Sequence, residues 1–294
     1  MNRLSLLLAG ALALAPGWTF AQEAAPPASM AELAIPSHDA RLNGFIYLAA
    51  GAGPHPTVLF LHGYPGNERN LDLAQVVRRA GYNAMYVDYR GSWGSGGTFS
   101  PANALEDVES VMAWAREPQN AAKYRIDTGQ LSLAGHSFGG WLALMTAARD
   151  PSVQCVAAMA AWNLGWAADR FESHAEEAKG LRDYLAWTAD PKGGPMRLDA
   201  DAVMREVAAQ AAGWNYLSQA AALKDRPLLL VAATRDTPDE GVARHQDLAR
   251  AIRETGGEAV ELVVYEDDHP FSAHRTELGD TLVRWLRTEC AASH

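Results

Sequence analysis

The chain has 294 residues, and its 25 lysines and arginines against 35 aspartates and glutamates give a formal net charge of −10 at pH 7. This length holds one large α/β domain or two ordinary ones. Because no cluster of basic side chains is available to neutralise phosphates, the composition argues against nucleic acid as a partner.

The N-terminus has the pattern of a secretory signal peptide over residues 1–21. Arg3 supplies a positive charge, residues 4–15 form an apolar run, and Ala21 is a small residue of the kind a signal peptidase accepts. Twelve apolar residues are too few to cross a hydrocarbon layer of about 30 Å, and no later segment has the length of a membrane span. We predict cleavage before Gln22, export to a periplasm or the medium, and a mature charge of −10 − 1 = −11.

Residues 22–40 are predicted to be a leader, whose stretch EAAPPAS (23–29) is typical of a flexible segment. The two cysteines, Cys155 and Cys290, have neither metal-site nor redox spacing. Cys155 lies in the apolar run VQCVAAM, which is typical of a small core residue. We therefore expect both thiols to be free.

Residues 41–294 alternate between strand and helix patterns and are predicted to form one domain. Apolar runs bounded by turn residues predict strands at 45–49, 57–61, 84–87, 131–134, 153–160, 227–233 and 260–265. Amphipathic patterns predict helices at 71–80, 102–116, 140–149, 241–254 and 276–288. This alternation predicts an α/β fold, with a mostly parallel sheet covered by helices on both faces. Residues 162–223 interrupt it with a helical pattern broken at DPKGGP (190–195), and we interpret them as a helical cap insertion.

One serine lies in the motif GHSFG (135–139), between a predicted strand and a predicted helix. A strand–turn–helix of this kind is the setting of a nucleophile elbow, where Gly135 and Gly139 lack the Cβ atoms that would collide. The hydroxyl of Ser137 then stands clear of the sheet, and the helix N-terminus favours a developing negative charge. The alternative is an ordinary serine in a glycine-rich turn.

A nucleophile for acyl transfer also needs donors for the oxyanion. The strand at 57–61 ends in HGYPG (62–66), where His62 and Gly63 would aim the backbone N–H of Tyr64 at the serine. The second donor would be the amide of Phe138. The other interpretation is a Pro-Gly turn with a buried histidine.

A base and an orienting acid are expected on the loops after the last two strands. His269 follows the strand at 260–265 closely, whereas His274 begins the final helix, so His269 is the favoured base. After the strand at 227–233, Asp236 is the favoured acid and Asp239 the reserve. With these positional requirements met together, we predict that Ser137 is a nucleophile.

The order Ser, Asp, His and these motifs resemble the α/β-hydrolase superfamily over residues 45–286. DYRGSWGSGG (88–97) and DHPFSAHR (268–275) are similar to the branch of prolyl-oligopeptidase-type peptidases and dienelactone-hydrolase-type esterases. Phe138 stands where those peptidases usually carry tryptophan, and Ser137 where the dienelactone enzymes typically carry cysteine. We also expect none of the large N-terminal propeller of those peptidases, because only about twenty residues lie between the predicted cleavage site and the first predicted strand.

The resemblance implies that the insertion forms a lid over the serine. Its aromatic residues are then either core or the lining of an acyl or aryl pocket, for which Trp162 and Trp166 are the candidates. The glycine-rich run 90–97 matches no phosphate-binding motif, and we interpret it as a loop bordering the site that Arg90 pins by hydrogen bonds. Asp88 is expected to be structural. No metal and no cofactor are predicted.

The leading hypothesis is a secreted serine hydrolase that cleaves carboxylic esters through an acyl-enzyme. The alternative is a peptidase or amidase of the prolyl-oligopeptidase type acting on small peptides. A remote third hypothesis is a ligand-binding relic of the fold without catalysis. The partner is a small-molecule ester or peptide, and the sequence makes no prediction of oligomeric state.

Overall fold

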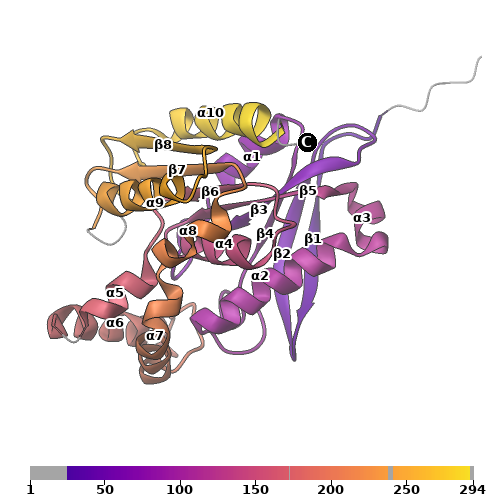
Figure 1. Ribbon diagram of the computed structural model, residues 1–294. Helices are drawn as coiled ribbons and strands as arrows, with labels where there is room; N and C mark the ends of the chain where they lie inside the picture. Colours follow the sequence, from indigo (N-terminus) through magenta and orange to yellow (C-terminus); the bar gives the residue numbers. More distant parts are fainter. Residues whose placement is uncertain (1–24, 172, 238–240, 292–294) are drawn as a thin grey trace, which may run out of the picture.

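The computed structural model describes residues 25–171, 173–237 and 241–291, and the predicted signal peptide lies outside them. The described residues form an eight-stranded sheet with the order β1-β2-β4-β3-β5-β6-β7-β8, and Figure 1 shows its twist. β1 and β2 pair antiparallel, β2 pairs antiparallel with β4, and every other neighbouring pair is parallel. The strands are β1 (Ser29–Ser37), β2 (Ala40–Leu48), β3 (His55–Leu61), β4 (Asn83–Val87), β5 (Ile126–His136), β6 (Val156–Met159), β7 (Leu228–Ala233) and β8 (Val260–Tyr265).

Helices cover both faces of this sheet. α1 (Leu71–Arg79) and α10 (Arg275–Trp285) pack on one face, and α2 (Pro101–Arg116), α4 (Phe138–Arg149) and α9 (Val242–Glu254) pack on the other. The short α3 (Pro118–Tyr124) precedes β5, and a π-helical turn (Leu286–Cys290) follows α10. β4 and β7 are buried along their whole length, as strands covered on two faces must be. The predicted α/β fold with its mostly parallel sheet is confirmed.

The segment between β6 and β7 forms a group of helices at the side of the sheet, at the lower left of Figure 1. It contains α5 (Leu164–Arg170), α6 (Ala175–Thr188), α7 (Ala200–Trp214), the 3-10 turn Tyr216–Gln219 and α8 (Ala220–Leu223). α6 ends directly before the turn-rich run 190–195, where Gly194 sits too close to the carbonyl of Thr188 to carry a Cβ. No helix among the described residues is long and apolar enough to cross a bilayer.

The sheet begins inside the segment predicted to be a leader, so the boundary at residue 40 was wrong. Ser29–Ser37 pairs with Ala40–Leu48 as a hairpin. Leu33, Ile35 and Ser37 are buried while the residues between them are exposed, the two-residue alternation of a half-covered strand. The alanine- and proline-rich composition on which the leader was predicted masked this alternation.

Cys155 and Cys290 form a disulfide, so the expectation of two free thiols was also wrong. Cys155 precedes β6 in the centre of the sheet, and Cys290 ends the helical segment that follows α10. Packing of α10 on the sheet brings the two Cα atoms to 5.8 Å, within the range that a disulfide spans. A separation of 135 residues hides this proximity in the sequence.

We expect removal of this disulfide to destabilise the protein strongly. Closing a loop of 135 residues restricts the unfolded chain, with an expected contribution of about 3–5 kcal/mol, or about 10 °C in Tm. Thermal unfolding of the protein and of a Cys155→Ala/Cys290→Ala variant, each with and without dithiothreitol, measures it. The Tm of the double variant should not change when dithiothreitol is added. Equal Tm values for the oxidised protein and the variant would contradict the prediction.

Candidate active site

Ser137 occupies a sharp turn between β5 and α4. Its backbone has φ 58° and ψ −123°, in a region that a residue with a side chain rarely adopts. The turn is held from both sides, because the Ser137 N–H donates to the carbonyl of Met159 (2.9 Å) and the N–H of Trp162 donates to the Ser137 carbonyl (3.1 Å). The end of β6 therefore fixes the serine in this conformation.

The two flanking glycines are required by close approaches of the backbone. A Cβ on Gly135 would overlap the carbonyl of Gly139, and a Cβ on Gly139 would overlap the carbonyl of Leu61 at the end of β3. The strand–turn–helix therefore has the geometry of a nucleophile elbow.

The turn at residues 62–66 lies against the serine. A Cβ on Gly63 would be 3.0 Å from the Ser137 Cβ and 3.4 Å from its Oγ. His62 is buried beneath the turn, where burial lowers its pKa to about 4, and its neutral ring donates through Nδ1 to the Gly63 carbonyl (2.7 Å). This places the Tyr64 amide, a predicted oxyanion donor, on the turn that contacts Ser137, with the Phe138 amide at the first position of α4. The Tyr64 hydroxyl hydrogen-bonds Thr188 at the end of α6.

His269 and Asp236 meet at the carboxyl ends of β8 and β7, which are neighbouring parallel strands. His269 Nδ1 lies 2.9 Å from Asp236 Oδ2 and 3.0 Å from Oδ1, and the carboxylate is almost fully buried. His269 also lines a cavity of about 220 Å³ together with Ser137, Gly63 and Tyr64. The predicted nucleophile, base, acid and oxyanion turn are thus brought together, while Asp239 lies outside the described residues.

His274, the other candidate base, is paired with a different carboxylate from that of His269. His274 Nδ1 lies 2.9 Å from Asp267 Oδ2, and the same buried carboxyl group accepts backbone N–H groups from Asp268, Ala273 and His274. Burial raises the pKa of Asp267, but these hydrogen bonds outweigh it and lower the pKa to about 2. His274 is not among the residues that line the cavity of Ser137. The Asp267–His274 pair closes the loop that carries His269.

We expect Asp267 to stabilise the protein in a pH-dependent way. Its folded-state pKa of about 2 is below the ordinary value of 3.8, so the contribution is complete above about pH 4 and is lost as the pH falls toward 2. The Tm difference between the protein and Asp267→Asn should therefore be largest near neutral pH and should narrow between pH 4 and pH 2.5. Glu266→Gln removes an exposed neighbouring carboxylate and is the control. A Tm difference that does not change with pH would contradict the lowered pKa of Asp267.

His136 is a site residue that the sequence analysis missed. Burial, and then the neighbouring His269, lower the pKa of His136 to about 3, so its ring is neutral. Its Nε2–H donates to the backbone carbonyl of His269 (2.9 Å), and the two ring centroids are 4.5 Å apart. The only sequence signal was a histidine directly before the serine. The nucleophile elbow is thus fastened to the loop of the predicted base.

We expect His136→Phe to lower kcat about tenfold with little change in KM, because one hydrogen bond that positions His269 is lost. His136→Gln can present an N–H at a similar reach and should recover most of that loss. Steady-state kinetics on both variants, with Tm measured in parallel, tests this. A loss in the phenylalanine variant that glutamine does not restore would assign His136 to core packing alone.

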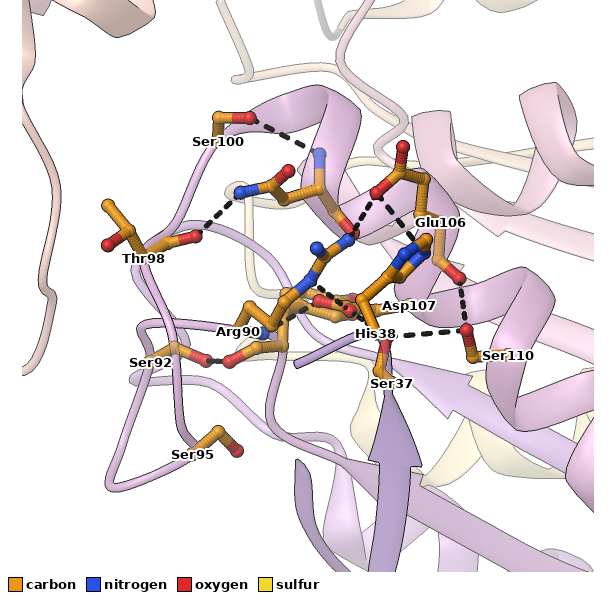
Figure 2. Close-up of polar contacts among 12 residues, drawn as sticks. Ser37, His38, Arg90, Ser92, Ser95, Thr98, Ser100, Glu106, Asp107 and Ser110 are labelled. Atoms are coloured by element: carbon orange, nitrogen blue, oxygen red, sulfur yellow. Dashed lines mark hydrogen bonds and ion pairs between the residues drawn. The ribbon is translucent and has the colours of Figure 1, made fainter. Parts of the chain in front are cut away.

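The loop at residues 90–97 is anchored to α2, as predicted from Arg90. Figure 2 shows the Arg90 guanidinium between Asp107 and Glu106, with Nε 2.6 Å from Asp107 Oδ1 and Nη2 2.6 Å from Glu106 Oε2. Ser37 donates to the same Asp107 carboxylate from β1 (2.6 Å). Further along the loop, the indole of Trp93 donates to the Pro65 carbonyl (2.7 Å). Arg90 therefore fixes the loop to α2, and Trp93 connects the same loop to the turn at residues 62–66 that faces Ser137.

Asp88, expected to be structural, lies beneath that turn. Burial raises its pKa to about 6, and the Tyr86 hydroxyl donates to its Oδ1 (3.0 Å). Its carboxylate is 3.8 Å from His62 Nε2 and 4.0 Å from Arg69.

The aromatic residues of the cap have different environments. Trp214 and Tyr216 are buried core. Trp162 lines a small cavity with wholly apolar walls that reaches Tyr64 and Phe138, and whose free volume is about 20 Å³. Trp166, the other pocket candidate, does not line it. The guanidinium groups of Arg170 and Arg244 each lie 4.6 Å from the Trp166 ring.

Comparison with known proteins agrees with this geometry. The model of the X-Pro dipeptidyl-peptidase (S15) family matches residues 39–261. An Escherichia coli protein named as an uncharacterized 31.7 kDa protein of the traX-finO intergenic region is 34% identical over 114 residues, 37% of this chain and 38% of its own length. This chain thus aligns with well under half of that curated relative.

Two solved structures share the fold at low sequence identity. An esterase from Pyrococcus furiosus superposes with a TM-score of 0.65 at 19% identity, covering 90% of this chain and 92% of its own. An acylaminoacyl peptidase from Pyrococcus horikoshii superposes with a TM-score of 0.64 at 15% identity, covering 90% of this chain and 42% of its own.

Proposed function

This chain belongs to the X-Pro dipeptidyl-peptidase (S15) family, and we propose that it hydrolyses carboxylic esters of short acyl chains through an acyl-enzyme. It is a serine hydrolase with an α/β-hydrolase fold, so the non-catalytic alternative is discarded. The observation that carries the proposal is the meeting of Ser137 and His269 on one cavity, with Asp236 2.9 Å from His269.

The reaction follows from these positions. Because the Nδ1–H of His269 donates to Asp236, the other ring nitrogen is the one that takes the proton of Ser137 as its Oγ attacks the carbonyl carbon. The amides of Tyr64 and Phe138 stabilise the resulting oxyanion. His269 then protonates the departing alcohol, and water adds to the acyl-enzyme by the same route to release the acid and restore Ser137.

The shape of the acyl side supports short acyl esters. The apolar cavity beside Phe138 has walls such as Trp162, Leu185 and Val207 and a free volume of about 20 Å³. On this measure one water molecule needs about 10–15 Å³, so a chain of one or two carbons fits without movement of the cap. Apolar walls also leave the amide groups of a peptide without hydrogen-bond partners.

A peptidase is the second candidate, and two observations favour it. The matching family is described as that of an X-Pro dipeptidyl-peptidase. In addition, Glu68 lines the cavity of Ser137, and a carboxylate at this position is suited to bind the N-terminal ammonium of a peptide.

Paired substrates separate the two candidates. We expect p-nitrophenyl acetate to be cleaved with a kcat/KM at least about tenfold above that of the octanoate, since octanoate exceeds the apolar cavity, and Ala-Pro-p-nitroanilide to be cleaved poorly. Glu68→Gln should leave acetate hydrolysis unchanged. Preferred cleavage of the dipeptidyl anilide, lost in Glu68→Gln, would instead establish the peptidase.

The proposed location is a periplasm or the medium, after removal of residues 1–21. The disulfide between Cys155 and Cys290 supports it, because disulfides persist in oxidising compartments. Expression of the full chain in a bacterium, followed by N-terminal sequencing of the periplasmic and medium fractions, should find a chain that begins at Gln22. An unprocessed chain confined to the cytoplasm would refute export.

A further inference from the structure

Exposed aromatic side chains gather beside the cavity of Ser137. Among the described residues, the large hydrophobic side chains that are exposed include Trp93 (36%), Tyr184 (40%) and Trp187 (65%). Each is connected to the turn at residues 62–66 or to its neighbour in this group. Isolated exposed hydrophobic residues need no explanation, but a contiguous aromatic patch beside a catalytic cavity indicates a binding surface.

We call the exposed side chains of Trp93, Tyr184 and Trp187 the aromatic rim. Tyr184 on α6 lines the same cavity as Ser137 and His269, and its ring meets Tyr64 edge-on with centroids 5.7 Å apart. One turn along α6, Trp187 stacks beside Tyr184 with centroids 5.9 Å apart and planes only 15° from parallel. Because the rings are stacked, each covers part of one face of the other, and the remaining exposed surface of both continues outward from the cavity.

Trp93, on the loop at residues 90–97, contacts the turn at residues 62–66 separately. Its indole N–H donates to the Pro65 carbonyl, and the Arg69 guanidinium lies 4.6 Å from its ring. Because one face of Trp93 is occupied in this way, Tyr184 and Trp187 provide the accessible ring surface. Trp187, at 65% exposed, has the most surface to offer a ligand.

We propose that Tyr184 and Trp187 bind an aromatic ring in the alcohol part of the substrate, so that aryl and arylmethyl esters are preferred; this rests on the proposed esterase function. His269 must reach the leaving alcohol to protonate it, and the cavity that contains His269 is the one that Tyr184 lines. The small apolar cavity beside Phe138, which is lined by neither His269 nor Tyr184, is left for the acyl group. Aromatic faces stack with rings in preference to open alkyl chains.

Three acetates that share one acyl group test the proposal. Benzyl acetate carries an aromatic ring, cyclohexylmethyl acetate a saturated ring of similar size, and ethyl acetate no ring. In Trp187→Ala and Tyr184→Ala we expect KM for benzyl acetate to rise about two- to tenfold with kcat little changed. KM for cyclohexylmethyl acetate should rise less in both variants, and in Trp187→Ala, whose side chain does not line the cavity of Ser137, KM for ethyl acetate should stay constant. Tyr184→Phe keeps the ring and should behave as the parent protein.

Met30→Ala is the matched control, since Met30 is 55% exposed on β1 and lines a different cavity. A ring in the acyl part, tested with ethyl phenylacetate, should show no dependence on Trp187. If the variants weaken ethyl phenylacetate instead of benzyl acetate, or weaken all three acetates equally, the assignment to the alcohol ring is overturned.

A binding measurement separates this inference from the esterase proposal. Saturation-transfer NMR with benzyl alcohol, on the Ser137→Ala chain, should show transfer to the ring protons that Trp187→Ala reduces several-fold and Met30→Ala does not. If no ester is hydrolysed but this transfer is present and depends on Trp187, the esterase proposal fails and the ring site stands. Ester hydrolysis without transfer, and with KM unchanged in both variants, overturns the ring site alone.

Discussion

Replacement of Ser137 by alanine is expected to lower kcat by about 10⁴- to 10⁶-fold and to leave the fold intact. The change removes one hydroxyl, and the strained backbone of residue 137 is held by Met159 and Trp162 through main-chain hydrogen bonds that alanine keeps. Rates with p-nitrophenyl acetate, labelling by a fluorophosphonate probe and Tm measure the three parts of this expectation.

Ser152→Ala provides the control for that experiment. Ser152 is exposed just beyond the other end of α4, so its loss should affect neither rate nor labelling. If Ser137→Ala kept more than a few per cent of the activity, or still reacted with the probe, Ser137 would not be the nucleophile.

Replacement of His269 by alanine is expected to remove at least about 10⁴ of the rate, whereas His274→Ala should change it less than about fivefold. The two variants are matched, because both histidines follow β8 and each lies 2.9 Å from a buried aspartate. Of the two, His269 lines the cavity of Ser137 and His274 does not. His274→Ala should instead lower Tm, since it removes one hydrogen bond that holds Asp267.

The pH profile adds a second readout. Neutral imidazole alone can accept the proton of Ser137, so the rate should fall on the acid side in the parent protein and in His274→Ala. The residual rate of His269→Ala should lose this acid limb. Equal losses of rate in His269→Ala and His274→Ala would contradict the assignment of His269 as the base.

Local sequence patterns were enough to predict most of the strands, most of the helices and the nucleophile turn. The strands β3, β4, β5 and β7 were found because a buried parallel strand needs a continuous apolar run, which is local information. The edge strand β8 was also found from its apolar run, although it is only partly buried. The turn around Ser137 was also found locally, because the backbone at Gly135 and Gly139 tolerates no Cβ. Strand β1 was missed because it has no continuous apolar run. Its buried residues alternate with exposed ones, and the composition of the segment favoured a flexible leader.

Which side chains meet depends on how distant segments of the chain pack together. The pairing of His269 with Asp236, and of His274 with Asp267, depends on β7 and β8 being neighbours and on the path of the loop after β8. The disulfide depends on α10 packing against the sheet, and the exposure of Trp187 depends on how α6 packs. Such contacts join residues far apart in the chain. Their energies depend on distances in the folded structure, which cannot be read from residue types or from their spacing in the sequence. Periodicity and turn chemistry are local properties, and the sequence therefore specified the elements while their packing specified the partners.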